Sequence, residues 1–141
     1  MDAGGGNVDE NIISNAVSGA LNPDSREALK HAEQYYESIR KMKTDIDKIT
    51  KNTGYTEDYI FEVKKHLFLE KHDLGGENPE YFHPDYEIGQ SWQRLINGKN
   101  IQSHDYILLK HEYAERQYMS KGFSQREAHD RRMKNIIILS R

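Results

Sequence analysis

The sequence predicts an all-α protein, with a single compact domain of about five or six helices behind a flexible N-terminus. Apolar residues recur at intervals of three and four positions through most of the chain. Capping residues and glycines divide that pattern into segments of helical length. Outside the closing Ile136–Leu139 run, no segment alternates apolar and polar residues as a half-buried strand does. The chain has 141 residues, enough for one domain with a modest core.

The N-terminal part is predicted to be a lead, residues 1–23, before a helical domain at residues 24–141. Gly4-Gly5-Gly6 is typical of a flexible linker. A short helix is expected from Asp9 to about Ala20, because Asn22-Pro23 then interrupts the chain.

The next predicted helix is a long one, capped by Asp24 or Ser25 and running to about Asn52. Its Asn52-Thr53-Gly54 end is typical of a helix that closes on a left-handed glycine. Its apolar positions form one stripe: Ala28, Leu29, Ala32, Tyr35, Tyr36, Ile39, Met42, Ile46 and Ile49.

A third helix is predicted to begin at the cap Thr56, with acidic residues in its first turn, where they favour the helix dipole. Its core-facing residues are expected to be Ile60, Val63, Leu67 and Phe68.

Residues 73–84 contain Gly75-Gly76 and two prolines, so they are predicted to form a loop. A fourth helix then runs from Asp85 to about Ile96 and ends at Asn97-Gly98.

Two further helices are predicted near the C-terminus. Ser103 is expected to cap the fifth, which ends at Gly122, and Ser124 and Glu127 form a capping box for the sixth. The closing Ile136–Leu139 run is open to three interpretations: a short strand, a last helical turn or a partner-binding tail.

Composition narrows the class of protein. Charged residues make up 30% of the chain, hydrophobic residues 35%, and the net charge is −3, which argues against a general polyanion binder. No apolar run is long enough to cross a bilayer, so we expect no membrane insertion. The chain has no cysteine, which excludes disulfides, thiolate nucleophiles and cysteine-type zinc sites.

The best candidate site lies in the predicted fifth helix. Residue directions advance by about 100° per position in a helix, which places His104, His111 and Glu115 within one narrow arc. The same arc holds apolar residues: Ile107, Leu108, Ala114, Tyr118 and Met119. Ionisable groups on an apolar face are costly unless they are paired or bind a metal.

The run from His111 to Glu115 indicates a metal site, because a histidine and a carboxylate on adjacent turns can share one ion. The predicted ligands of a divalent metal such as Zn²⁺ or Mn²⁺ are His111, Glu115 and His129, with His104 or His66 as alternatives. His66 can take part in this metal site only if the side of its helix that carries it faces the protein interior.

The predicted catalytic groups are Glu112 or Asp105 as the base that activates water, and His111 as a proton carrier. The competing interpretation is a buried histidine–glutamate pair that ties two helices together. Trp92 and Arg94 are candidates for substrate binding, by stacking and by clamping an anionic group. The alternatives are a core position for Trp92 and an ion pair for Arg94 with an acid such as Glu87.

Several spaced motifs occur in order between about Ser25 and Asp130. They are Glu33-Gln34-Tyr35-Tyr36, Lys51-Asn52-Thr53-Gly54-Tyr55, His66-Leu67-Phe68, Phe82-His83-Pro84-Asp85-Tyr86, Ser91-Trp92-Gln93-Arg94-Leu95, His104-Asp105, Leu108-Leu109-Lys110-His111-Glu112, Glu115, and Gly122-Phe123-Ser124-Gln125-Arg126-Glu127-Ala128-His129. With these motifs the chain resembles a helical domain at the C-terminal end of phage minor head proteins of the MuF type. The same domain type ends Rhs- and LXG-type polymorphic toxins.

The resemblance implies a mobile module carried by phage or toxin proteins, and an effector domain that acts on a cell. It implies an immunity protein, or a phage or secretion carrier, as partner, and a location in the cytoplasm or in a target cell after delivery. The chain departs from the family at residues 130–135, where the family has a tyrosine-rich ending.

Two functions follow from the sequence. One is a metal-assisted hydrolase that cleaves either a phosphodiester or a peptide bond. The other is a non-enzymatic helical interaction or structural module, in which the polar cluster specifies packing.

Overall fold

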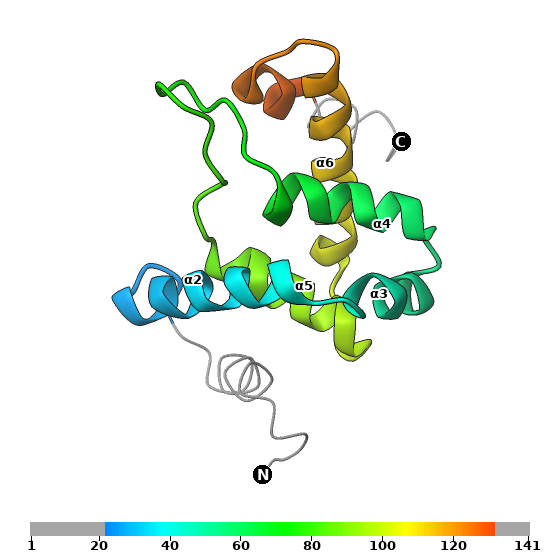
Figure 1. Cartoon of the computed structure of the whole chain (residues 1–141). Coiled ribbons are helices and arrows are strands. Elements are labelled where there is room, and N and C mark those ends of the chain that lie inside the picture. Colours follow the sequence, from blue (N-terminus) through cyan, green and yellow to red (C-terminus); the bar gives the residue numbers. More distant parts are fainter. Residues whose placement is uncertain (1–21, 132–141) are drawn as a thin grey trace.

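The computed structural model describes residues 22–131 and confirms the all-α prediction (Figure 1). Its elements are α2 (Arg26–Lys41), α3 (Asp45–Thr53), α4 (Glu57–Lys64), the π-helix η2 (Lys65–Leu69), α5 (Tyr86–Asn97) and α6 (Ser103–Ser120). Residues 125–131 are also helical. The predicted helix at residues 9–20, the flexible N-terminus and the run at residues 136–139 lie outside the described residues. The predicted domain boundary stays a prediction.

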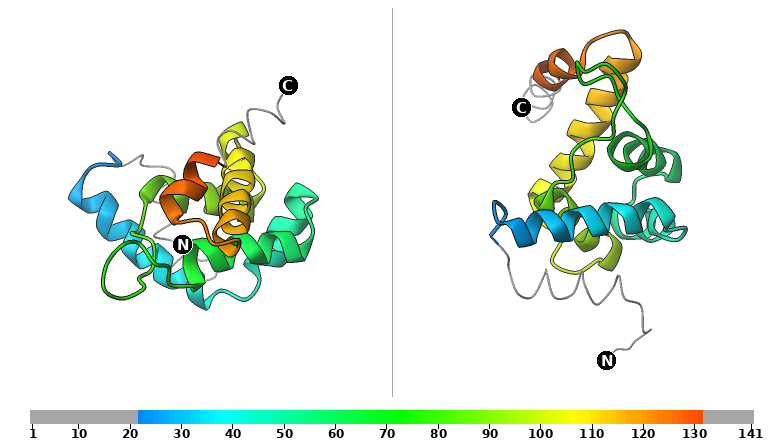
Figure 2. Two further views of the ribbon diagram at one scale, coloured as in Figure 1. Left: turned by 90° about the horizontal axis from the view of Figure 1, so that it is seen from above. Right: turned by 60° about the vertical axis from the view of Figure 1, so that its left-hand side comes forward.

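The helices form two groups that meet at one core (Figures 1 and 2). Helices α2 and α3 pack on α5, while α4 and η2 pack on α6. Contacts of α3 with α4, of α2 with η2 and of α5 with α6 join the two groups. The buried core residues come from every one of these elements: Tyr35, Tyr36, Ile39, Ile49, Ile60, Val63, Leu67, Phe68, Trp92, Leu95 and Leu109. The predicted core stripe of the third helix is therefore confirmed.

The long helix predicted to run to about Asn52 is instead two helices, and this prediction was wrong. Met42 has extended backbone angles, φ −68° and ψ 141°, and ends α2. The carbonyl oxygen of Met42 accepts a hydrogen bond of 3.0 Å from Lys64 Nζ. The same ammonium group contacts Asp45, the first residue of α3, at 2.9 Å. A side chain from α4 therefore stabilises the break, and no local signal in the sequence marks it.

The predicted helix ends are largely confirmed. Ser25 Oγ and Thr56 Oγ1 each accept a backbone hydrogen bond of 3.1 Å in the first turn of their helices. Gly54 and Gly98 close α3 and α5 with φ of 82° and 73°, in the left-handed region that favours glycine.

Of the two caps predicted near the C-terminus, one is confirmed and the other is wrong. Ser124 and Glu127 form the predicted capping box, with bonds of 2.9 and 3.1 Å. Ser103 is the first helical residue of α6 and not its cap, because Gln102 occupies the cap position. The Gln102 backbone N–H donates to Asp105 Oδ2 at 2.8 Å, so the acid inside the first turn secures this end.

The predicted loop between the third and fourth helices is confirmed, since residues 70–85 are not helical. One isolated antiparallel bridge, between His72 and Glu80, closes its base through backbone bonds of 2.7 and 2.8 Å. Asp85 Oδ1 then accepts from the Ile88 N–H at 3.0 Å and caps α5.

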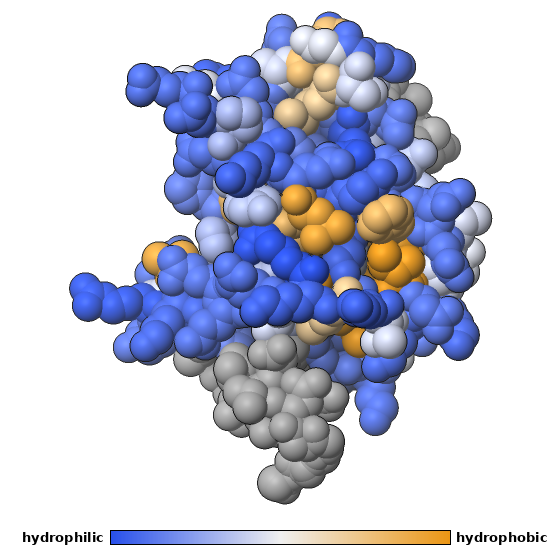
Figure 3. Space-filling model, viewed as in Figure 1, coloured by the Kyte–Doolittle hydropathy of each residue, from blue (hydrophilic) through white to orange (hydrophobic). Residues whose placement is uncertain are grey.

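The surface seen in Figure 3 is mostly hydrophilic, with a small apolar area near its centre. Among the described residues, no helix combines the length and apolar character that a membrane crossing requires.

Candidate functional site

One histidine and two glutamates meet in the interior, between η2 and α6. His66 Nε2 lies 2.8 Å from Glu115 Oε1 and 3.7 Å from Glu112 Oε1. One ligating atom from each of the three residues lies within 4.8 Å of the other two. The exposed fractions are 1% for His66, 6% for Glu112 and 2% for Glu115. We call these three residues the His/Glu cluster.

Local structure explains how the His/Glu cluster forms. Glu112 and Glu115 are three positions apart on α6, so they share one face of that helix. His66 lies in η2, where the Glu70 N–H bonds to the Lys65 carbonyl at 2.9 Å, an i to i+5 bond. Such π turns shift the register of a helix and occur often at functional sites. The register at η2 brings His66 inward against α6.

A cavity of about 240 Å³ adjoins the His/Glu cluster. Both glutamates line it, and the other lining residues are Tyr36, Leu67, Phe82, His83, Ile88, Gln125 and His129. His129 Nδ1 lies 3.7 Å from Glu115 Oε2, and Gln125 Nε2 donates to the same oxygen at 3.5 Å. The last described helix therefore contributes two polar groups next to Glu115.

The His66 ring is held by two other rings. Its centroid lies 4.8 Å from that of His72 and 5.1 Å from that of Phe82. His72 Nε2 donates to the His66 carbonyl oxygen at 2.7 Å, and burial lowers the pKa of His72 below its ordinary value. His66 Nδ1 is buried and has no hydrogen-bond partner among the described residues. A buried polar atom of this kind is uncommon, and it is the ring nitrogen that does not contact the glutamates.

Arg116 connects α6 to the helices that carry His66. Its guanidinium donates to Glu62 at 2.7 Å and to Glu70 at 2.6 Å. The pKa of Glu62 is lowered by hydrogen bonds from Lys65 and Arg116, and that of Glu70 by the bond from Arg116. These charged groups fix the helices on both sides of the His/Glu cluster.

The face of α6 that is buried differs from the predicted one. The buried residues of this helix are Asp105, Leu109, Glu112 and Glu115. The side chain of His104 is 67% exposed and Ile107 is 41% exposed, so the predicted arc was wrong for these positions. Apolar residues occur on several sides of α6, and the buried acids find partners on other helices, so periodicity alone misplaced the face.

Of the predicted metal ligands, the structure brings Glu115 and His129 together but not His111. His111 is half-buried on α6, and the group of ligating atoms contains His66 in its place. Glu112, the predicted base, lies within the group. The sequence offered His66 as an alternative ligand on the condition that its side of the helix faces the core. His66 meets this condition in the π turn η2, where it is buried.

Asp105, the other predicted base, belongs to a separate ion pair. It accepts hydrogen bonds from Ser91 at 2.6 Å, from Arg94 at 2.7 and 2.8 Å and from the Gln102 N–H at 2.8 Å. Burial alone would raise the pKa of Asp105, but these bonds hold it below its ordinary value. Arg94, predicted to clamp a substrate, is thereby engaged with Asp105 and not with Glu87.

Trp92, predicted to stack on a substrate, is fully buried in the core, at 0% exposure. Its Nε1 donates to Asp45 Oδ2 at 3.1 Å. The structure therefore gives Trp92 the alternative core position, and it lines neither the His/Glu cluster nor the adjoining cavity.

No protein-family model, curated protein or solved structure matched the chain.

Proposed function

We propose that this domain is a phage- or toxin-associated effector that performs metal-assisted hydrolysis at the His/Glu cluster. The observation that carries the proposal is the convergence of three buried ligating groups beside a cavity. Buried carboxylates and imidazoles are costly unless they are paired or coordinate a metal. A cavity next to such a group gives a substrate access to it.

The spacing of the donor atoms suits a divalent cation. Around a tetrahedral Zn²⁺ with bonds of about 2.0–2.1 Å, neighbouring ligand atoms are about 3.3 Å apart. His66 Nε2 lies 2.8 and 3.7 Å from the nearer oxygens of the two glutamates, which needs only small shifts. One imidazole and two carboxylates suit Zn²⁺ or Mn²⁺.

His66, Glu112 and Glu115 would hold the cation, which would supply Lewis-acid chemistry for hydrolysis. His129 lies on the other side of Glu115, at 3.7 Å from Oε2, and its side chain is 47% exposed. Its position between Glu115 and solvent suits His129 for carrying a proton between the site and solvent.

The resemblance to toxin-associated and phage-associated domains supports the effector part of the proposal. An effector that acts on a cell needs a protein that protects its producer, so an immunity protein is the expected partner. The same resemblance supports a phage or secretion carrier that delivers the domain.

Isothermal titration of untagged protein with Mn²⁺ and Zn²⁺, together with growth of cells that express the domain, tests the proposal. We expect one site per chain and slowed growth, and Glu115→Gln should abolish both while the far-ultraviolet circular dichroism stays unchanged. His104→Gln is the matched control, because His104 is an exposed histidine on the same helix. Absence of metal binding in the unchanged chain would reject the proposal.

The second candidate function is a non-enzymatic interaction module in which the His/Glu cluster only ties η2 to α6. The bond of 2.8 Å between His66 and Glu115, at 1% and 2% exposure, favours it. Under this alternative, Glu115→Gln destabilises the fold and the unchanged chain binds no metal.

A further inference from the structure

We propose that the substrate cleaved at the His/Glu cluster is a polypeptide with a large apolar side chain next to the scissile amide, and not a nucleic acid. This inference rests on the proposed hydrolytic function and names its substrate class. In the reaction, water adds across the amide C–N bond. Its hydroxyl joins the acyl carbon, its remaining proton goes to the leaving nitrogen, and no oxidant or reductant is needed.

The apolar wall of the cavity is the first argument. Its lining includes Tyr36, Leu67, Phe82 and Ile88. Its volume of about 240 Å³ is below the range for drug-sized ligands, about 300–1,000 Å³, and suits one large side chain. Transfer of an apolar side chain from water into this space is favourable.

The charge of the cavity is the second argument. None of the described residues that line it is lysine or arginine, whereas two are glutamates. Proteins that bind nucleic acids neutralise phosphates with lysine and arginine, and phosphoryl-transfer sites place cations on the phosphate oxygens. With the proposed cation bound to the two glutamates, a polyanionic strand would still find no lysine or arginine for its remaining phosphates among the described lining residues, whereas an uncharged peptide needs none.

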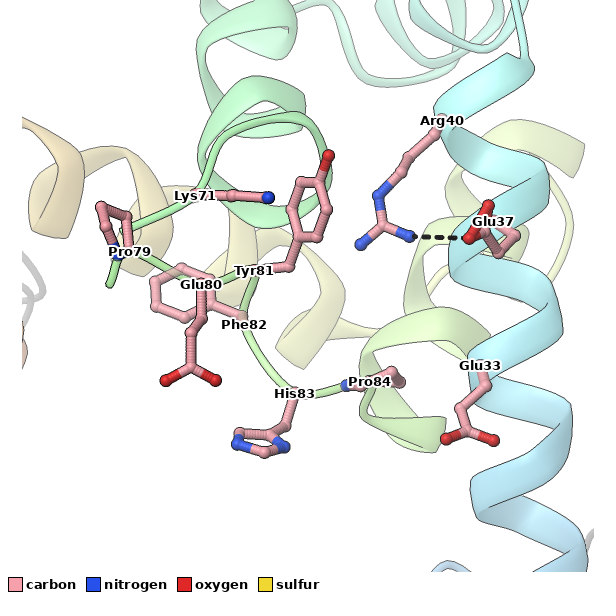
Figure 4. A pocket seen from close by; sticks show the side chains of 10 residues that line it. All are labelled: Glu33, Glu37, Arg40, Lys71, Pro79, Glu80, Tyr81, Phe82, His83 and Pro84. Atoms are coloured by element: carbon pink, nitrogen blue, oxygen red, sulfur yellow. Dashed lines mark ion pairs between the residues drawn. The ribbon is translucent and has the colours of Figure 1, made fainter. Parts of the chain in front are cut away.

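A neighbouring cavity of about 550 Å³ extends the same surface, because Phe82 and His83 line both. Figure 4 shows that it is polar and of mixed charge, with Glu33, Glu37 and Glu80 facing the same space as Arg40 and Lys71. This cavity offers room for the peptide on one side of the scissile bond.

The cations of this second cavity are already engaged. Arg40 lies 4.0 Å over the Tyr81 ring and donates to the Phe68 carbonyl at 2.7 Å, and Lys71 lies 5.3 Å from the same ring. Arg40 also lies 3.9 Å from Glu37 (Figure 4). These cations do not form a track for a phosphate backbone, while the mixed charge suits the polar side chains of a peptide.

The test incubates the full chain with Mn²⁺ or Zn²⁺ and a degenerate peptide library, and in parallel with single-stranded DNA, double-stranded DNA and RNA. Mass spectrometry of the peptides should show cleavage beside large apolar residues, and the nucleic acids should stay intact. Nucleic-acid cleavage, or no peptide cleavage by protein that binds metal, would overturn the inference. Metal titration of the same samples tells these outcomes from failure of the proposed function, in which no metal binds.

Ile88→Ala sharpens the test, because it enlarges the cavity without touching the His/Glu cluster. We expect the preference to move towards larger side chains, with kcat/KM ratios between substrates changing on the order of 10-fold. Ile107→Ala is the matched control, since Ile107 is exposed on α6. An unchanged preference in Ile88→Ala would contradict the assignment of this cavity to the substrate side chain.

Discussion

Two buried polar clusters are centred on Lys64 and His66, two residues apart in one helical segment, and they differ in how completely their polar atoms are paired. Lys64 Nζ, in α4, donates to Asp45 Oδ1 and to the Met42 carbonyl, each at 3.0 Å, and forms an ion pair with Asp45 Oδ2 at 2.9 Å. Trp92 donates to Asp45 as well, at 3.1 Å. His66, only two residues later, contacts the glutamates of α6 through Nε2, while its Nδ1 has no hydrogen-bond partner among the described residues.

Under the proposed function, the difference separates a structural cluster from a functional one. The lysine cluster, which comprises Lys64, Asp45, Met42 and Trp92, pairs its ammonium group with two hydrogen-bond acceptors, and its residues line neither of the two cavities described above. The His/Glu cluster keeps a buried nitrogen without a partner and borders a cavity. Buried polar groups that are fully satisfied specify a fold, whereas the proposed function assigns chemistry to ionisable groups that meet beside a cavity.

The largest effect on stability is expected when the acid of the lysine cluster, Asp45, is removed. Asp45→Ala leaves the ammonium group of Lys64 buried and without its carboxylate, so we expect the free energy of unfolding to fall by about 3–5 kcal/mol. Urea unfolding followed by circular dichroism measures this change.

Asp47→Ala is the control for that experiment, because Asp47 forms an exposed ion pair with Lys51, which should contribute at most about 1 kcal/mol. Equal losses of unfolding free energy in the two variants would show that the lysine cluster does not stabilise the fold more than an exposed ion pair does. The comparison between the two clusters would then no longer hold.

A second prediction concerns metal removal. A cation bound at the His/Glu cluster stabilises the folded state by about 2.7 kcal/mol when its free concentration is about 100 times Kd. We therefore expect a chelator to lower the melting temperature of the unchanged chain. The same chelator should have no effect on Glu112→Gln, whereas Asp105→Asn should keep the response, because Asp105 pairs with Arg94 outside the cluster. A chelator response that survives in Glu112→Gln would place the metal elsewhere.

A third prediction uses the buried histidine His31. The His31 ring packs against Tyr35 and Tyr86, with centroids 6.4 and 5.8 Å away, and burial lowers its pKa. Above the unfolded pKa of about 6.5 this histidine is neutral in both states. As the pH falls below that value, the unfolded chain takes up a proton and the folded chain does not, so stability is lost on acidification.

For one such group, the free energy of unfolding changes by at most about 1.4 kcal/mol per pH unit. Chemical unfolding between pH 7 and pH 5 should therefore show a shallower loss of stability in His31→Gln than in the unchanged chain. His104→Gln is the control, because His104 is exposed. Parallel profiles in all three proteins would show that burial of His31 does not affect folding through its charge.

Sequence reasoning predicted most of the fold because its signals are local. Ser25 and Thr56 cap helices, Gly54 and Gly98 end them, and the stripe from Ile60 to Phe68 is buried. The break at Met42 escaped prediction because the group that stabilises it, Lys64, comes from another helix. Apolar periodicity continues across residues 42–46 and gives no sign of that tertiary contact.

The candidate site was predictable only in part, for a related reason. Glu112, Glu115 and His129 were recognised from spacing along α6 and from the next capped helix. His66 replaces His111 because a π turn changes the register of its helix, and such a turn has no simple sequence pattern. The buried face of a helix is predicted from the side on which apolar residues outnumber charged ones. On α6 the buried side carries three acids, so this rule fails there.

The smallest effect is expected from a change in the helical segment that carries both Lys64 and His66 and so belongs to both clusters. Thr56 caps this helix through its hydroxyl, which accepts from the Tyr59 N–H at 3.1 Å. Thr56→Ala should lower the free energy of unfolding by about 1 kcal/mol, and Thr56→Ser should restore most of it. Because the cap lies more than two turns from His66, we expect metal affinity in isothermal titration to stay the same in both variants. A fall in metal affinity with Thr56→Ala would show that the His/Glu cluster depends on the order of the whole helix, and not on the π turn alone.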